Sequence, residues 1–170
     1  MIYNFYKIYL FLLLVIIASC DTSFTPTPVN NTSLSVDMNL SASQISIGEQ
    51  LIVSIDVQNA DSLYAMSLVF NYANSMFDID SITYGNLFED PLMVQPEVAS
   101  TELSISTQPG DLDSIQETAS GAACIIYLTS TVGGVDVFYI SSIHMIKSNG
   151  DFIDGFGALS ISTKEVEVAQ

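Results

Sequence analysis

The feature that most limits the fold of this chain is a period-two alternation of apolar and polar residues that starts at Leu34. In the clearest stretch the apolar positions are every second residue, Leu51, Val53, Ile55 and Val57. Successive side chains of a β-strand point to opposite faces, so this pattern is typical of half-buried strands. No segment after residue 33 shows the 3.6-residue period of a long amphipathic helix. We therefore expect an all-β fold.

About eight or nine short strands follow one another at a spacing of roughly ten residues, which is typical of an antiparallel β-sandwich. The expected strands are 34–40, 51–58, 63–72, 76–84, 102–106, 122–131, 135–143 and 156–163. Glycine-containing turns such as Gly133-Gly134 separate several of them. We predict one all-β domain, an antiparallel β-sandwich of about nine strands over residues 34–170, with a short acidic C-terminal tail.

The start of the chain has a different character, that of an export signal. Lys7 precedes an unbroken apolar run, Ile8 to Ile17, and the small residues Ala18 and Ser19 lead to Cys20. The tetrapeptide 17–20 resembles a bacterial lipobox, which implies that residues 1–19 are a lipoprotein signal peptide and that Cys20 is lipidated on sulfur. An ordinary signal peptide or an N-terminal anchor is the alternative. A spanning helix needs roughly 20 apolar residues, so an uncleaved anchor would be short.

Residues 20–33 are expected to form a flexible linker after the lipidated cysteine. The segment is rich in Thr, Ser and Asn, and Pro26 and Pro28 are unsuited to a helix or a central strand. Such a tether would hold the domain away from a membrane surface. We expect an exported protein that is lipid-anchored to the cell envelope, at the outer membrane or the cell surface, and that contacts the membrane through its lipid only.

The charge balance excludes two classes of partner. The chain has 3 Lys and Arg residues against 19 Asp and Glu residues, a net charge of −16. Nucleic-acid binding requires a basic face that neutralises phosphates, so no nucleic-acid partner is expected. Attachment to anionic lipid through a basic patch is excluded for the same reason.

The residues that usually carry catalysis are scarce. His144 is the single histidine, and Cys124 lies in an apolar stretch where a small buried residue is expected. Zinc needs several His or Cys ligands, which the chain lacks. With no tryptophan in so small a domain, a two-carboxylate glycosidase with an aromatic-lined cleft is disfavoured. We predict a non-enzyme with no catalytic residues and no metal ligands.

Calcium is the one cofactor that the sequence leaves open. Acidic clusters occur at Asp78 and Asp80, at Asp111 and Asp113, and at Asn149-Gly150-Asp151, and calcium prefers oxygen ligands of this kind. Solvated acidic loops are the simpler interpretation. We therefore predict no required cofactor.

A series of turns and strand ends follows residue 34 in a fixed order. It consists of the turn Gly48-Glu49 before a long alternating strand, Asn59, the strand end Phe70-Asn71-Tyr72, the segment from Met76 to Gly85, and the glycines at 121, 133, 134 and 150. This order resembles that of a cohesin domain, the receptor module for dockerins. It departs from the family pattern after Tyr72, where Ala73-Asn74 replaces the usual Asp-Pro.

This resemblance implies a jelly-roll-like sandwich and a non-catalytic module that binds a dockerin-type partner in a polysaccharide-degrading or surface assembly. The outward face of the strand 63–72 would form the binding surface, with Ala65, Ser67, Val69 and Asn71. Two alternatives stay open. One is a carbohydrate-binding module that takes a polysaccharide, for which Tyr84 and Phe88 are candidate platform residues, and the other is a structural envelope lipoprotein without a soluble ligand.

Overall fold

The structure is a computed structural model that describes residues 34–93, 96–99, 101–111, 118–153 and 163–170. Residues Thr32–Gln170 form one compact unit, here called the β-domain. Every described element of this unit is a strand. Both sheets and the whole described core belong to it, which is the property of a part that folds on its own. The predicted signal peptide, Cys20 and the linker lie outside the described residues.

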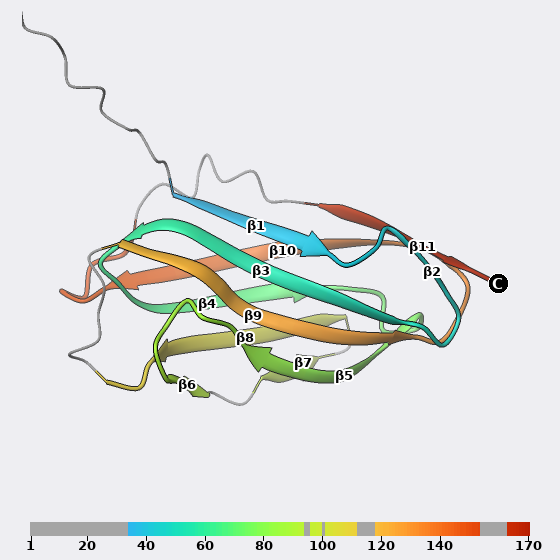
Figure 1. The fold of residues 1–170 in the computed structure, drawn as a ribbon, viewed down its shortest axis with the longest axis horizontal. Helices are drawn as coiled ribbons and strands as arrows, with labels where there is room; N and C mark the ends of the chain where they lie inside the picture. The colour runs from blue at the N-terminus through green and yellow to red at the C-terminus, as the bar shows by residue number, and fades with distance from the viewer. Residues whose placement is uncertain (1–33, 94–95, 100, 112–117, 154–162) are drawn as a thin grey trace, which may run out of the picture. The chain divides into compact units, whose positions relative to one another are not determined.

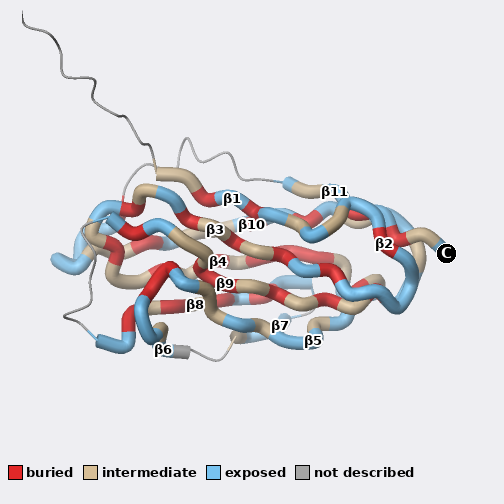
Figure 2. The backbone as a smooth tube through the Cα atoms, in the orientation of Figure 1, coloured by how far each residue is buried: buried red, intermediate tan, exposed pale blue. Residues whose placement is uncertain are grey.

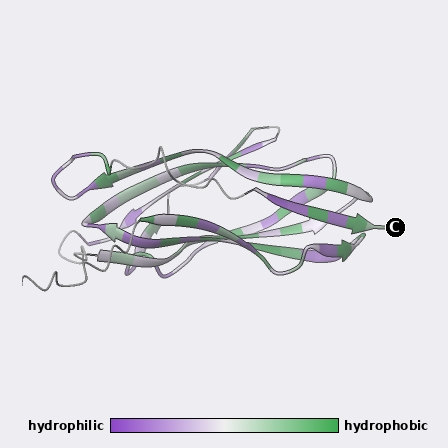
Figure 3. Cartoon of the chain, turned by 90° about the horizontal axis from the view of Figure 1, so that it is seen from above, coloured by the Kyte–Doolittle hydropathy of each residue, from purple (hydrophilic) through white to green (hydrophobic). Residues whose placement is uncertain are grey.

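The β-domain is a sandwich of two sheets, which Figure 3 shows as two separate layers. The first sheet has the order β1-β3-β9-β5 and is antiparallel throughout. Its strands are β1 (Ser35–Leu40), β3 (Gln50–Asp61), β9 (Thr118–Ser130) and β5 (Phe77–Tyr84).

The second sheet has the order β2-β11-β10-β4-β8-β6, and β7 also pairs with β8 (Figure 1). Its strands are β2 (Gln44–Ser46), β11 (Lys164–Ala169), β10 (Gly134–Lys147), β4 (Leu63–Asn71), β8 (Glu102–Pro109), β6 (Pro91–Met93) and β7 (Glu97–Ala99). The β2–β11 pair is parallel, so this sheet is mixed.

The predicted all-β sandwich is confirmed, and two details differ. The described residues contain eleven strands instead of about nine, because β2, β6 and β7 are only three residues long and too short to show alternation. The expected acidic tail instead contains a strand, β11, whose Val166 and Val168 are buried. Most of the expected strand at 156–163 lies outside the described residues.

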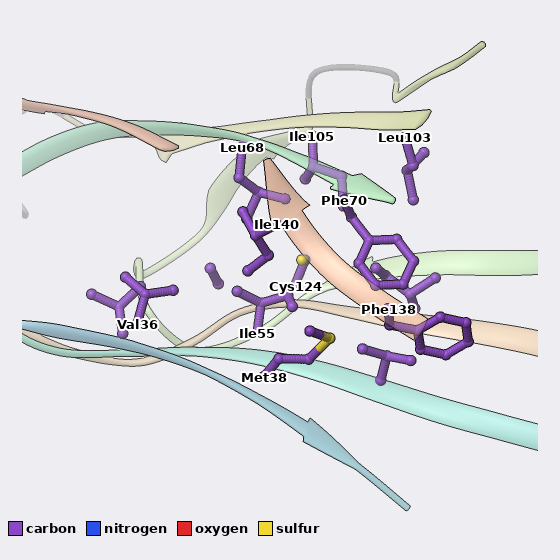
Figure 4. Close-up of a cluster of buried hydrophobic side chains, with 14 of the residues drawn as sticks. Val36, Met38, Ile55, Leu68, Phe70, Leu103, Ile105, Cys124, Phe138 and Ile140 are labelled. Carbon is purple, nitrogen blue, oxygen red and sulfur yellow. The ribbon is translucent and has the colours of Figure 1, made fainter. Parts of the chain in front are cut away.

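The core lies between the two sheets and is filled by the apolar half of each alternating strand. Figure 2 shows buried and exposed positions alternating along the strands. In the close-up of Figure 4, Met38, Ile55 and Cys124 from the first sheet face Leu68, Phe70 and Ile140 from the second. Phe138 packs edge-on against both Phe70 and Phe77, at ring-centre distances of 5.4 Å and 5.2 Å. Since these side chains face inward, the outward side of each sheet carries the residues available to a partner.

Candidate binding face

The candidate binding face is the outward side of β4 together with its neighbours β8 and β10. On β4 the residues Met66, Leu68 and Phe70 are buried in the core, so Ala65, Ser67 and Val69 point to the other side. These three side chains are half-buried, as expected at the centre of a sheet with strands on both sides. The structure therefore places three of the four predicted binding residues on one surface.

The strands on either side of β4 add small polar side chains to this face. Ser67 lies opposite His144 on β10 and Ser106 on β8, and Val69 lies opposite Ser142 and Ser104. The sequence analysis named only the β4 residues, because pairing partners distant in the chain cannot be found from one sequence. The resulting surface, called here the β4 face, consists of Ala65, Ser67, Val69, Ser104, Ser106, Ser142 and His144.

Asn71, the fourth predicted binding residue, does not expose its side chain on the binding face as expected. Its side chain is only 4 % exposed. Its amide Nδ2 donates a hydrogen bond to Ser141 Oγ at 2.8 Å. Ser141 stands in a register shift of β10, between Ile140 and Ser142, so both strands lose their regular pairing there. Asn71 thus holds the edge of the face together instead of presenting its amide to a ligand.

The β4 face is nearly flat. A hollow on this face has a volume of about 140 Å³ and is lined by Ala65, Met66, Ser67, Ser106, Thr107, Gln108, His144 and Ile146. Small-molecule sites usually enclose roughly 300–1,000 Å³. The surface is therefore shaped for another flat surface and not for a small ligand.

A wider hollow of about 490 Å³ lies at the turn after β10 and is lined by Lys147, Asn149, Asp151, Phe152 and Ile153. Its polar groups already pair with groups of the protein. Lys147 Nζ donates to Asp61 Oδ2 at 2.6 Å, and Asn149 Nδ2 donates to Asp151 Oδ2 at 2.7 Å. These pairs fix the turn and leave no nucleophile and base within reach of each other in this hollow.

Neither of the two conventional catalytic side chains is placed for catalysis. Cys124 is fully buried in the core, and this burial raises the pKa of its thiol to about 12, so the thiol is protonated at neutral pH. His144 is exposed, and its register partner on β4 is Ser67 with no carboxylate directly opposite. Within the described ranges no carboxylate orients His144 as the base that a serine nucleophile requires.

Two carboxylates of the acidic clusters, those of Asp80 and Asp151, accept local hydrogen bonds. Asp80 Oδ2 accepts from Gln50 Nε2 at 2.9 Å and from Thr129 Oγ1 at 2.8 Å, and these two bonds lower the pKa of the Asp80 carboxyl. Asp78 is exposed on the same strand, and Asp113 lies outside the described residues. Within the described part of the chain no group of three or more His, Cys, Asp or Glu residues could hold a metal ion.

The aromatic pair that the sequence suggested as a sugar platform does not form one. Phe88 is buried, with 8 % of its surface exposed. Tyr84 is half-buried, and its hydroxyl donates to the Ser106 carbonyl oxygen at 3.0 Å. Among the residues that the structure describes, the exposed aromatics are Tyr139 on β10 and Phe152, which pairs with Ile146. Seven residues of strand separate Tyr139 from Ile146, roughly 20 Å, so the two rings do not form one platform.

Comparison with known proteins gives a fold but no sequence family. No family model matches the chain, and no curated protein matches it. In the described residues no helix is long and apolar enough to cross a membrane.

The structure resembles solved cohesin modules over most of the chain, so the β-domain has the cohesin fold. A non-cellulosomal cohesin from the archaeon Archaeoglobus fulgidus matches with a TM-score of 0.63 and 14% identity, over 82% of this chain and 91% of that one. A type II cohesin domain from the cellulosome of Acetivibrio cellulolyticus matches with a TM-score of 0.65 and 15% identity, over 79% and 95%. A mutant type II cohesin–X-dockerin complex from Acetivibrio cellulolyticus matches with a TM-score of 0.60 and 14% identity, over 72% and 93%.

Proposed function

We propose that the β-domain is a non-catalytic receptor module that binds a dockerin-type protein module through the β4 face. The observation that carries this proposal is the combination of the cohesin fold with a flat outward face on the sheet β10-β4-β8. One solved structure with this fold is a cohesin–X-dockerin complex, which supports the same kind of partner here. The assembly would be a polysaccharide-degrading or other surface complex.

The chemistry of the face suits a protein partner. Small side chains such as Ser67, Ser104 and Ser106 let another backbone approach closely, and Val69 adds apolar contact between them. Serine hydroxyls both donate and accept hydrogen bonds, so they can pair with polar groups of a protein partner. Specific protein–protein interfaces of standard size bury about 800 Å² on each partner, which a flat sheet face can supply.

The experiment is a pull-down with the β-domain as bait against secreted and envelope proteins of the source organism, with calcium and with a chelator. A retained protein is then produced as an isolated module, and its affinity is measured by calorimetry. The variant Ser67→Arg places a bulky charge in the centre of the β4 face and should weaken binding at least about tenfold. Ser54→Arg, at an equally half-buried position on β3 of the other sheet, is the matched control.

A dockerin-type module that binds wild type and Ser54→Arg but not Ser67→Arg supports the proposal. Equal binding by both variants would move the interface elsewhere. Retention of a polysaccharide with no protein would instead favour the carbohydrate-binding alternative.

We further propose that the protein is exported and anchored to the cell envelope by a lipid on Cys20, with residues 20–33 as the tether. The motif 17–20 and the short apolar run before it support this assignment. Cells grown with an alkyne-labelled fatty acid should incorporate the label into wild type and into Cys124→Ser, but not into Cys20→Ser. Label that persists in Cys20→Ser would contradict lipidation at this residue.

A further inference from the structure

A stripe of exposed apolar residues runs along the first half of β10, beside the β4 face. Val135, Val137 and Tyr139 are 59 %, 46 % and 42 % exposed, respectively. They occupy alternate positions of one strand, so all three point to the same outward side. The register shift between Ile140 and Ser142 brings Ser142 and His144 to this side as well. Apolar side chains that lie next to one another on a surface mark a contact site more often than single exposed residues do.

Two glutamates border this stripe on the neighbouring strand. Glu165 lies opposite Val137 and Glu167 lies opposite Val135 in the β10–β11 register, and both carboxylates are exposed. On the other side, Tyr139 lies opposite Asn71, and Asn71 lies opposite the exposed Glu102 of β8. Lys164, the lysine of β11, lies opposite Phe138, whose ring points into the core. The apolar stripe is therefore bordered by two glutamates on the β11 side, and on the β4 side Glu102 lies two strands away from Tyr139.

The charges decide what kind of occupant fits. A second copy of this chain would bring a further net charge of −16, and in a symmetric contact through this stripe its own Glu165 and Glu167 would border the same interface. Like charges that face each other across an interface cost several kcal/mol. A segment with apolar side chains in the centre and Lys or Arg at its margins matches both the stripe and its borders.

We propose that Val135, Val137, Tyr139, Glu165 and Glu167 form a second contact surface, the β10–β11 patch, for a basic apolar segment of the protein partner. The proposal rests on the proposed function in that the partner docked at the β4 face supplies this segment. Tyr139 lies between the two surfaces, so one partner can cover both. The apolar stripe supplies contact area, and the glutamates attract the basic segment and speed its association.

The first test uses a defined probe and needs no knowledge of the partner. A short synthetic peptide of alternating Lys and Leu is titrated into the isotope-labelled β-domain, and backbone amide shifts are followed by NMR. The expected result is that shifts concentrate at 135–139 and 165–167. A Lys/Ser peptide of the same charge should bind about tenfold more weakly, because it lacks the apolar side chains. Shifts of equal size at all acidic surfaces, or equal binding of both peptides, would overturn the proposal.

Variants separate the apolar contribution from the charge contribution. The double variant Val135→Ser/Val137→Ser should weaken the Lys/Leu peptide about tenfold, whereas Val98→Ser, at an exposed valine on β7, should not. Glu165→Gln/Glu167→Gln should reduce the salt dependence of binding, and Asp78→Asn/Glu89→Gln is the control with the same loss of charge at exposed positions elsewhere. Unchanged binding by both patch variants would overturn the proposal.

Calorimetry of the same variants with the captured partner module tests this inference separately from the proposed function. Partner binding that is lost in Ser67→Arg but unchanged in the patch variants retains the receptor function and rejects the patch. Patch-dependent peptide binding with no dockerin-type partner rejects the receptor function and retains the patch. Weaker partner binding in both sets of variants supports both proposals.

Discussion

Asp61 and Lys147 form an ion pair that links the end of β3 to the end of β10. The Lys147 ammonium donates to Asp61 Oδ2, and this hydrogen bond, together with one from Ser62, lowers the pKa of the Asp61 carboxyl from its ordinary value of 3.8. Both groups are partly or fully exposed, so the pair fixes geometry more than it stabilises the fold.

We predict that Lys147→Met raises the pKa of Asp61 towards its ordinary value, as measured by carboxyl NMR titration. In the wild type the pair contributes to stability above the pKa of Asp61 in the unfolded chain. This contribution is lost as the pH falls through the lowered pKa of the folded state. Lys164→Met is the control and should leave Asp61 unchanged. An Asp61 titration that is identical in Lys147→Met and the wild type would contradict the pairing.

Single residues also mark the limit of what the sequence predicts. Alternation places Ala65, Ser67 and Val69 outward, because β4 alternates regularly from residue 65 to residue 70. The same rule gives the wrong exposure for Asn71, because the register shift at Ser141 lies on another strand, 70 residues later in the chain. The sequence suggests Phe88 as a surface aromatic, yet its side chain is buried, because it lies after the end of β5, where period-two alternation no longer applies.

Among the elements, β10 has the clearest division between core and surface. Its neighbouring aromatic residues Phe138 and Tyr139 are 0 % and 42 % exposed, and only Phe138 contacts the rings of Phe70 and Phe77. Because Phe138 and Ile140 face the core, a strictly alternating strand would carry polar residues at positions 135, 137 and 139. The departure from alternation was visible in the sequence as an apolar stretch, but only the β10–β11 register shows that its outward side lies beside glutamates.

Phe138→Ala should lower the free energy of unfolding by about 3–5 kcal/mol, because it leaves a cavity between the sheets. Tyr139→Ala should change it by less than about 1 kcal/mol, because its ring is largely outside the core. Urea denaturation of both variants measures the difference. A Tyr139→Ala variant as unstable as Phe138→Ala would show that the outward side of β10 is packed and would contradict its role as a contact surface.

The short elements show why the strand count was harder to predict than the fold class. β6 and β7 pair with β8 over three residues each, and β2 pairs with the distant strand β11. Three residues cannot display a period, and a parallel pair between the two ends of a domain leaves no local signal. The sandwich is predictable because the long strands β3, β4 and β9 each alternate between buried and less buried residues over several positions.

For the whole chain, the dominant property beyond the fold is its negative charge. With 19 acidic residues against 3 basic ones, repulsion within the chain opposes the compact state. Salt should therefore stabilise the β-domain, and its melting temperature should rise by about 2–5 °C between about 0.02 M and 0.5 M NaCl at neutral pH. Near the isoelectric point, at about pH 4.1, the rise should disappear, which provides the internal control. An equal rise at both pH values would assign it to a general effect of salt instead of charge screening.

The central claim is that the β-domain binds a protein partner on the outward side of β10-β4-β8. The most direct measurement is hydrogen–deuterium exchange of the β-domain alone and in complex with the partner module captured by it. The account predicts slower exchange in β4, β8 and β10 on binding, and in β11 if the β10–β11 patch is also covered, with no change in β1, β3 and β5. Slower exchange confined to β1, β3 and β5 would place the partner on the opposite sheet and contradict the account.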